Sequence, residues 1–375
     1  MGKKFFVILL CAFNSLFVFA DSWLEKPDYD FYSHPLLEVS KAGDNFAVGK
    51  ILKIVKTEEQ KEKLSVKIVY GAARKQIVEA TNYREGSFIN PRPGQWILVS
   101  YTDNMNEAVV VDYDRSLPLV VLLFLFSLLV LLVGGLKKLG GLFTLFLGMM
   151  LMIFVYGSLI IYGYSPVIVS LFVIFFTTLL TNFFIGQFSK KSIAATVGTL
   201  LSIVVVLGLG VIFYSLANIN GFSLEPVQML NYFSKNYSSQ PFNNFRQLLL
   251  SILILGASGV IIDVAVCIAS SMEEIVSKRT DISRKELVRY GMNTGRNIVA
   301  IASNTLVLAY FGASLILILA TTISIHSLTY LFNSEWFFLV VFQAFAGSIG
   351  FLLAVPFTAI AAGYLMVNSR NPSSL

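Results

Sequence analysis

Residues 248–268 read LLLSILILGASGVIIDVAVCI, an apolar run that holds a single charged residue, Asp263. A membrane-spanning helix needs about 20 predominantly apolar residues, so this run is long enough to cross a bilayer. A carboxylate near the hydrocarbon costs at least about 2.5–3.5 kcal/mol on insertion scales. Asp263 therefore needs a charged partner, a water-filled cavity or protonation, and we expect the functional residues to lie around it.

The composition of the whole chain agrees with a membrane location. Of its 375 residues, 56% are hydrophobic and 13% are charged, whereas soluble domains carry roughly 25% charged residues. The composition predicts a polytopic α-helical membrane protein with the lipid bilayer as its surroundings. The net charge of +6 does not indicate a nucleic-acid partner, because Lys and Arg in the loops of a membrane protein report its orientation.

The first 20 residues resemble a secretory signal peptide. Lys3 and Lys4 precede an apolar stretch, and Ala20 ends a cleavage-like sequence with small residues at the −3 and −1 positions. The alternative is an uncleaved anchor helix, and both readings place residues 21–115 outside the cell. Cleavage would remove Cys11 and leave Cys267 alone, so no intramolecular disulfide would then be possible.

Residues 21–115 predict an extracytoplasmic all-β domain after an irregular lead-in over 21–45. Short β-branched segments bounded by Gly, Pro, Asn and charged residues predict five strands, at 47–56, 64–70, 76–81, 95–101 and 108–112. Five strands in so short a segment favour a small OB-like barrel, with hairpins at 71–74 and 92–94. Trp96 and Ile97 are candidates for its core.

Seven apolar segments follow in a transmembrane domain at 116–366, before a tail at 367–375. They lie at about 117–136, 140–161, 166–186, 193–216, 247–269, 297–320 and 337–364. Loops with most of the Lys and Arg alternate with loops that hold only Lys235 and Arg246. The positive-inside rule therefore predicts that the tail is cytoplasmic.

Polar residues concentrate in the fifth and sixth segments. Gly256, Gly259 and Asp263 recur at three- and four-residue steps, which places them on one helical face, and small residues allow another helix to approach. Arg296 enters the membrane at a similar depth, so a packed Asp263–Arg296 pair is expected. The other members of this predicted polar centre are Ser270, Ser271, Asn293, Asn297, Asn304 and Thr305. Structural joining of helices and a solute pathway are both open interpretations.

Several small residues and one proline are expected to shape the helices. Gly295, Gly347 and Gly350 are candidates for close helix packing, and Pro356 is expected to kink the seventh segment, with Thr358 bonding a freed carbonyl. Between the fifth and sixth segments, Asp281 is expected to cap a short interfacial helix. That charged connection is interpreted as a solvated surface or as a contact with anionic lipid.

Enzyme signatures are weak. The sequence contains no HExxH zinc motif and no phosphate-binding GxxxxGK[ST] loop, and Asp263 has no acidic companion within a span. Gly256-Ala257-Ser258-Gly259 has the form of a rhomboid serine motif, but His326 is expected in a loop. We therefore expect a protein that is not an enzyme and that has no cofactor and no metal site.

Three blocks closely resemble the YibE/F-like family of bacterial multi-pass membrane proteins. They are GASGVIIDVAVCIASSMEEI (256–275), ELVRYGMNTGRNIVAIASNTLVLAYFG (286–312) and GSIGFLLAVPFTA (347–359). The resemblance implies a plasma-membrane protein of no established biochemical activity, with a shorter paralogous membrane subunit as a possible partner. The positions that match the family pattern are Asp263, Ser270, Ser271, Asn293, Gly295, Arg296, Asn304, Thr305 and Pro356.

The chain also departs from the family pattern. Asn297, Val340 and Gln343 stand where two acidic residues and an arginine are expected, so a mechanism that needs several carboxylates is doubtful. We expect a permease-like transporter component for a small solute or ion, centred on Asp263 and Arg296. The alternative is a non-transporting assembly or scaffold subunit whose outer domain binds a partner.

Overall fold

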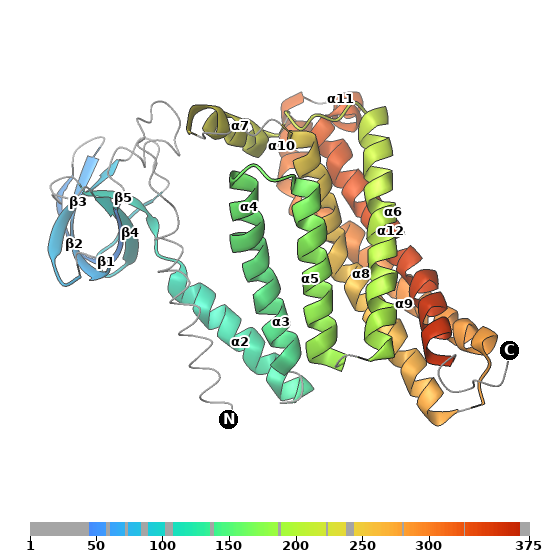
Figure 1. Ribbon diagram of the computed structural model, residues 1–375. Helices are drawn as coiled ribbons and strands as arrows, with labels where there is room; N and C mark the ends of the chain where they lie inside the picture. Colours follow the sequence, from blue (N-terminus) through green and yellow to red (C-terminus); the bar gives the residue numbers. More distant parts are fainter. Residues whose placement is uncertain are drawn as a thin grey trace. The chain divides into compact units, whose positions relative to one another are not determined.

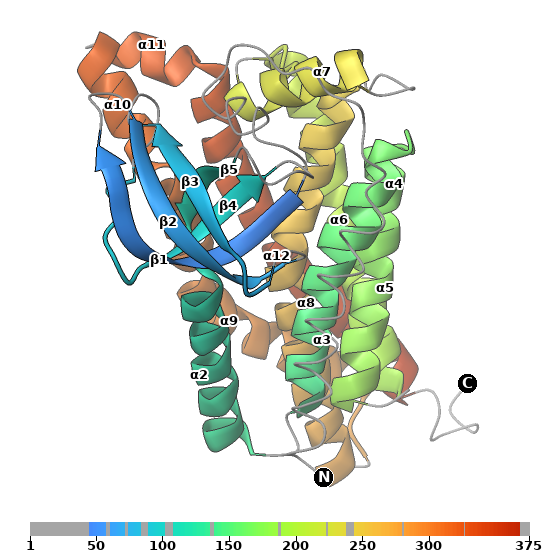
Figure 2. The ribbon, with the colours of Figure 1, turned by 90° about the vertical axis from the view of Figure 1, so that its left-hand side faces the viewer.

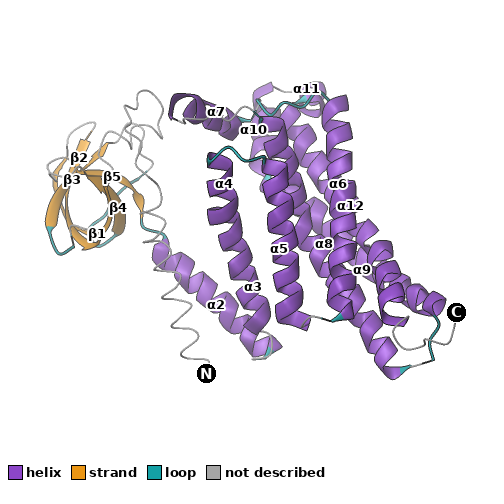
Figure 3. Ribbon diagram, in the orientation of Figure 1, coloured by secondary structure: helices purple, strands orange, loops and turns teal. Residues whose placement is uncertain are grey.

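The computed structural model describes residues 45–57, 61–71, 74–83, 89–101, 108–135, 139–186, 189–222, 224–237, 244–279, 281–325 and 327–367. The chain divides into two compact units, Met1–Leu129 and Val130–Leu375, which we describe separately. Strands belong to the first unit, and the second is helical (Figures 1 and 3). The predicted signal peptide, the lead-in up to residue 44 and the tail beyond Val367 lie outside the described residues.

The first unit contains a closed five-stranded barrel, as predicted. Its strands are β1 (Asn45–Thr57), β2 (Lys61–Tyr70), β3 (Ile77–Tyr83), β4 (Trp96–Tyr101) and β5 (Ala108–Tyr113). They follow the order β1-β2-β3-β5-β4, and β4 pairs with β1 to close the barrel. All pairings are antiparallel except β3 with β5. Twelve apolar side chains with at most 8% exposure fill the interior, including Leu64, Val66 and Ile97.

One of the two predicted hairpins is present. Strands β2 and β3 are adjacent in the sheet, and the amide of Lys75 donates to the Ile68 carbonyl at 2.9 Å across their turn. The turn at 92–94 is not a hairpin, because β3 and β4 do not pair. Instead the amide of Gly94 donates to the Ile51 carbonyl at 2.8 Å. The prediction failed here because turn residues alone do not reveal which strands are neighbours.

Trp96 does not lie in the barrel core, contrary to the prediction. Its side chain is 41% exposed, whereas Ile97 is fully buried. Successive side chains in a strand point to opposite faces, so the two residues could not both point inward. Trp96 lies opposite the exposed Lys50 of β1. Ile97 is therefore the core residue of this pair.

The barrel is joined to the first membrane segment by only two residues. Strand β5 ends at Tyr113 and helix α2 (Ser116–Gly134) begins at Ser116. The Asp114 carboxylate accepts a hydrogen bond from the Ser116 amide at 2.9 Å, which satisfies a free donor at the helix start. Arg115 forms an ion pair with Asp112 and holds the pKa of that carboxyl below its usual value. Both residues of this junction therefore interact with residues beside them in the sequence.

The helices of the second unit are as follows. They are α3 (Leu139–Met150), the π-helical η3 (Leu151–Tyr156), α4 (Gly157–Ile161), α5 (Pro166–Gly186), α6 (Lys190–Leu216), α7 (Glu225–Tyr237), α8 (Phe245–Lys278), α9 (Arg284–Ala313), α10 (Leu315–Ile325), α11 (Leu328–Asn333) and α12 (Glu335–Val367). Within the described ranges, six helical segments of the chain are long and apolar enough to cross a membrane, with α3, η3 and α4 forming one of them.

The predicted sixth segment is a broken helix rather than a straight span. Helices α9 and α10 are bent by 54° at Ser314, and together they give a seventh candidate span. The amide of Ser314 is shared between the carbonyls of Tyr310 and Phe311, both at 3.2 Å. Such shared bonds are common where a helix ends. The apolar pattern continued through this point, so sequence alone did not predict the break.

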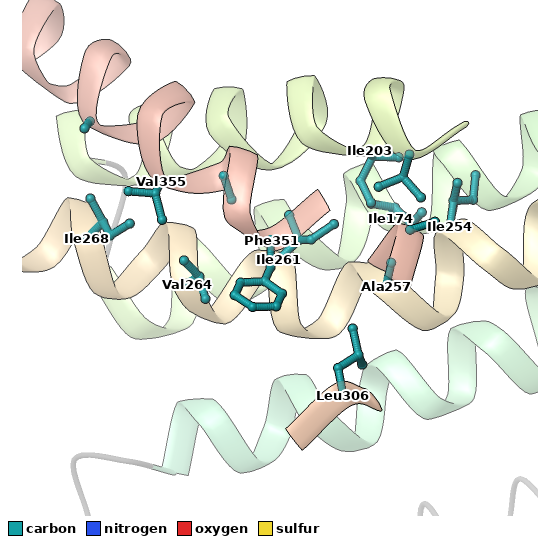
Figure 4. Packing of buried hydrophobic residues seen from close by; sticks show 14 of the residues in the cluster. Ile174, Ile203, Ile254, Ala257, Ile261, Val264, Ile268, Leu306, Phe351 and Val355 are labelled. Carbon is teal, nitrogen blue, oxygen red and sulfur yellow. The ribbon is translucent and has the colours of Figure 1, made fainter. Parts of the chain in front are cut away.

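The core of the second unit is centred on α8. Leu253, Ile254 and Ile261 on this helix are fully buried, together with Ile203 of α6 and Phe351 of α12. Figure 4 shows these elements packed side by side, with Leu306 of α9 near Ala257. Glycines permit the approach: a Cβ at Gly347 would lie 2.9 Å from Leu306 Cδ2.

Candidate functional site

Asp263 lies on an exposed face of α8. Its neighbours Ile262, Val264 and Ala265 are buried, whereas the carboxylate side chain and Cys267, one turn away, are exposed. A Cβ built at Gly259 would have no atom within 4 Å. The prediction that this face lies in a helix–helix seam is therefore wrong at these positions. Among the described side chains, a seam with α9 is present toward Gly256, where the Tyr310 hydroxyl is in close contact.

Arg296 does not pair with Asp263. Among the described residues Asp263 forms no salt bridge, and Arg296 Nη1 donates to Asn293 Oδ1 at 3.5 Å. Both charged side chains are exposed. The expected buried pair is thus absent, and each charge lies on the surface of the helical unit.

The contacts between α8 and α9 explain why the pair does not form. A Cβ at Gly291 would meet Met272, so these two residues mark one level of the antiparallel helices. At 1.5 Å per residue, Asp263 is about 13 Å beyond this level and Arg296 about 8 Å beyond it. Each side chain also leans toward the N-terminus of its own helix, and in antiparallel helices those directions diverge.

The remaining polar residues of α9 continue along its exposed side. We call this set the polar strip, and its members are Asn293, Arg296, Asn297, Asn304 and Thr305, all exposed. On α8, Ser271 Oγ donates to the Cys267 carbonyl at 2.9 Å, a local bond that does not reach α9. The structure thus places Asp263 and the polar strip on uncovered surfaces of two adjacent helices.

Ser270 belongs to a different place, a small hollow between α5, α6 and α8. Asn182, Lys191, Ser192, Ala195, Val266 and Ala269 line it with Ser270. Asn182 Nδ2 donates to Thr196 Oγ1 at 3.0 Å, and Lys191 Nζ forms an ion pair with Glu273 at 2.6 Å. Sequence reasoning missed Asn182, which bonds to Thr196 of α6, and Lys191, which pairs with Glu273 of α8. The available signal was a polar residue, Asn182, near the C-terminal end of the third segment, which precedes the basic start of the fourth.

The small residues named from the sequence lie mostly at helix contacts. A Cβ at Gly295 would lie 2.9 Å from Val355 Cγ2, and one at Gly350 would lie 2.9 Å from Ile261 Cδ1. Helix α12 continues through Pro356. Thr358 packs against Gly198, and its buried hydroxyl has no hydrogen-bond partner among the described residues. The prediction that Thr358 bonds a freed carbonyl is therefore wrong.

The connection between α8 and α9 also differs from the prediction. Ser283, and not Asp281, caps the helix, and its hydroxyl and the Glu286 carboxylate form a reciprocal capping box. The helix that starts there is not a short one, because it continues as α9 to Ala313. In the ranges that are described, no group of three or more His, Cys, Asp or Glu is placed to hold a metal ion.

The fold and this arrangement define a multi-span helical membrane protein with a small β-barrel domain. The family model of the YibE/F-like protein matches residues 122–368. The chain therefore belongs to the YibE/F-like family, and the match covers the membrane segments and not the barrel. No curated protein and no solved structure matches the chain significantly.

Proposed function

We propose that this YibE/F-like protein is a permease-like transporter component for a small solute or ion. The observation that carries the proposal is the exposed carboxylate of Asp263, which lies in the apolar part of α8 and has no ion-pair partner in the described chain. Ionisable residues inside membrane segments commonly face water-filled cavities and mark solute pathways. Asp263 would bind a cation or carry a proton, and the polar strip of α9 would line the route.

The energetics favour water or a polar partner beside Asp263. Exposure to lipid would cost about 2.5–3.5 kcal/mol on insertion scales, and no other side chain of the described unit neutralises the charge. Water reaching the open face at Gly259 would remove most of this cost. We further propose that the protein resides in the plasma membrane, with the barrel outside and the C-terminus inside.

The proposal predicts that Asp263→Asn abolishes ion movement without unfolding the protein. The full chain would be reconstituted in liposomes, and currents driven by proton, Na⁺ or K⁺ gradients would be recorded on a solid-supported membrane. We expect a current from the wild type, a loss of at least tenfold in the variant, and an unchanged melting temperature, since no described ion pair is broken. Ser277→Ala, at the exposed end of α8, is the matched control and should conduct normally.

The measurement also has a clear negative result. An Asp263→Asn protein that carries the same current as the wild type would show that the carboxylate is not part of the pathway. A wild type without current for any gradient would favour the second candidate function, an assembly subunit. The open face of α8 supports that candidate too, because a polar surface of another membrane subunit, such as a shorter paralogue, could cover it. Co-purification in mild detergent would identify such a partner.

A further inference from the structure

Strands β1 and β2 lie side by side in the barrel (Figure 2), and their outward face is strongly basic. Its exposed lysines are Lys50, Lys53, Lys61, Lys63 and Lys67. In the part of the chain that the structure describes, none of them forms a salt bridge. The carboxylate of Glu62 is buried and accepts a hydrogen bond from Asn82 at 3.3 Å. Among the described residues, Glu79 of β3 is the exposed acidic residue beside them, so the described part of this face keeps a positive excess.

The positions of these lysines are unfavourable for the barrel itself. Lys50 lies directly opposite Lys67 across the β1–β2 ladder. Like charges at directly opposite positions destabilise a sheet. Folding of the described strands does not explain this like-charge pair, which favours a negatively charged partner for the surface.

Apolar side chains are interleaved with the lysines. One row across four strands runs Trp96, Lys50, Lys67 and Ile77, with Trp96 41% and Ile77 63% exposed. Aromatic residues and Lys side chains with apolar stems suit the boundary between lipid headgroups and hydrocarbon. A soluble polyanion would need the charges alone, so the exposed apolar members of the row favour a membrane surface.

The chain itself keeps the barrel close to such a surface. Two residues separate the end of β5 from the start of α2, and they span at most about 7 Å when fully extended. The barrel is thus held beside the headgroups on whichever side of the bilayer it lies.

We propose that the β1–β2 face of the barrel binds the anionic phosphate headgroups of the bilayer in which α2 is anchored. The five lysines supply the charge, and Trp96 and Ile77 enter the headgroup layer beside them. This docking holds the barrel against the membrane, and it does not depend on whether the helical unit transports a solute.

The test uses the full chain in lipid nanodiscs with Trp96 as the reporter. Trp23→Phe and Trp336→Phe leave this single tryptophan, whose fluorescence is quenched by a nitroxide on lipid headgroups if the face docks. We expect strong quenching with phosphatidylcholine–phosphatidylglycerol discs and weak quenching with phosphatidylcholine alone. Each basic residue near an anionic surface contributes roughly fivefold, so Lys50→Gln/Lys53→Gln/Lys67→Gln should lower the docking equilibrium roughly a hundredfold.

A matched variant removes three charges elsewhere on the barrel. Arg74, Lys75 and Arg92 are exposed and lie outside the β1–β2 face, so changing all three to Gln should leave quenching nearly intact. Equal losses in both triple variants, or equal quenching on neutral and anionic discs, would overturn the proposal. Removing lysine repulsion should not unfold the barrel, and unchanged circular dichroism would verify this.

Two further measurements distinguish lipid headgroups from other anions as the ligand of this face. Inorganic phosphate and chloride at equal ionic strength should weaken docking equally, because screening is the only effect expected. Selective displacement by phosphate would overturn the proposal in favour of a discrete phosphate site. A face that stays undocked on anionic discs but binds labelled polyphosphate would overturn it in favour of a soluble polyanion.

Discussion

Replacing Gly198 with alanine is expected to destabilise the helical unit by about 1–3 kcal/mol, the usual cost of overpacking a tight contact. A Cβ at this position would lie 2.9 Å from the Cα of Thr358, and a backbone atom cannot move aside as a flexible side chain can. Helices α6 and α12 would have to separate. The melting temperature of the full chain in detergent measures the effect.

The matched control is Gly259→Ala on α8. A Cβ there meets nothing within 4 Å, and alanine is favoured over glycine in a helix interior by about 0.5–1 kcal/mol. The two substitutions add the same methyl group and should shift the melting temperature in opposite directions. Equal destabilisation by both would mean that the open face of α8 is covered by another part of the protein.

Ile97→Ala is expected to cost the barrel about 2–5 kcal/mol, because it leaves a cavity in a fully packed core. Ile97 is fully buried, whereas the adjacent Trp96 is 41% exposed. Trp96→Ala should therefore cost much less, although it removes the larger side chain. Amide hydrogen exchange of the β-strand peptides in the full chain reports the free energy of local opening.

The outcome that would contradict this assignment is a greater loss from Trp96→Ala than from Ile97→Ala. That result would mean that the register of β4 is shifted by one residue, because such a shift exchanges the inner and outer faces of a strand. The pairing of Trp96 with Lys50 and of Ile97 with Gly49 would then be wrong.

Strands and helices were predicted well from the sequence, because the spacing of apolar residues along the chain differs between the two kinds of element. The five strands and most apolar segments appear within a few residues of their predicted places, but α8 extends 9 residues past the predicted fifth segment and α9 begins 13 residues before the predicted sixth. The pattern did not determine which faces would be covered: Asp263 and Arg296 were expected to pair, yet the packing of Gly291 against Met272 sets them at different levels.

The basic face of the barrel could not be predicted from the sequence for the same reason. Lys50 and Lys67 are far apart in the sequence and come together only through the register of β1 and β2. Likewise, Lys191 was visible as a charge at the start of a helix, but its ion pair with Glu273 depends on how α6 packs against α8. Local residue patterns therefore did not predict which residues far apart in the sequence would be neighbours in the fold.

The most direct test of the account is the reaction of Asp263→Cys with a membrane-impermeant methanethiosulfonate reagent. The full chain would be labelled in native membranes, in a background of Cys11→Ala and Cys267→Ala. Such reagents need a thiolate in water, so a water-accessible pathway at Asp263 predicts rapid labelling. Ile252→Cys, an exposed apolar position on the same helix, should not react. An unreactive Asp263→Cys, with Ser277→Cys labelled in the same membranes opened to both sides, would contradict the proposed pathway.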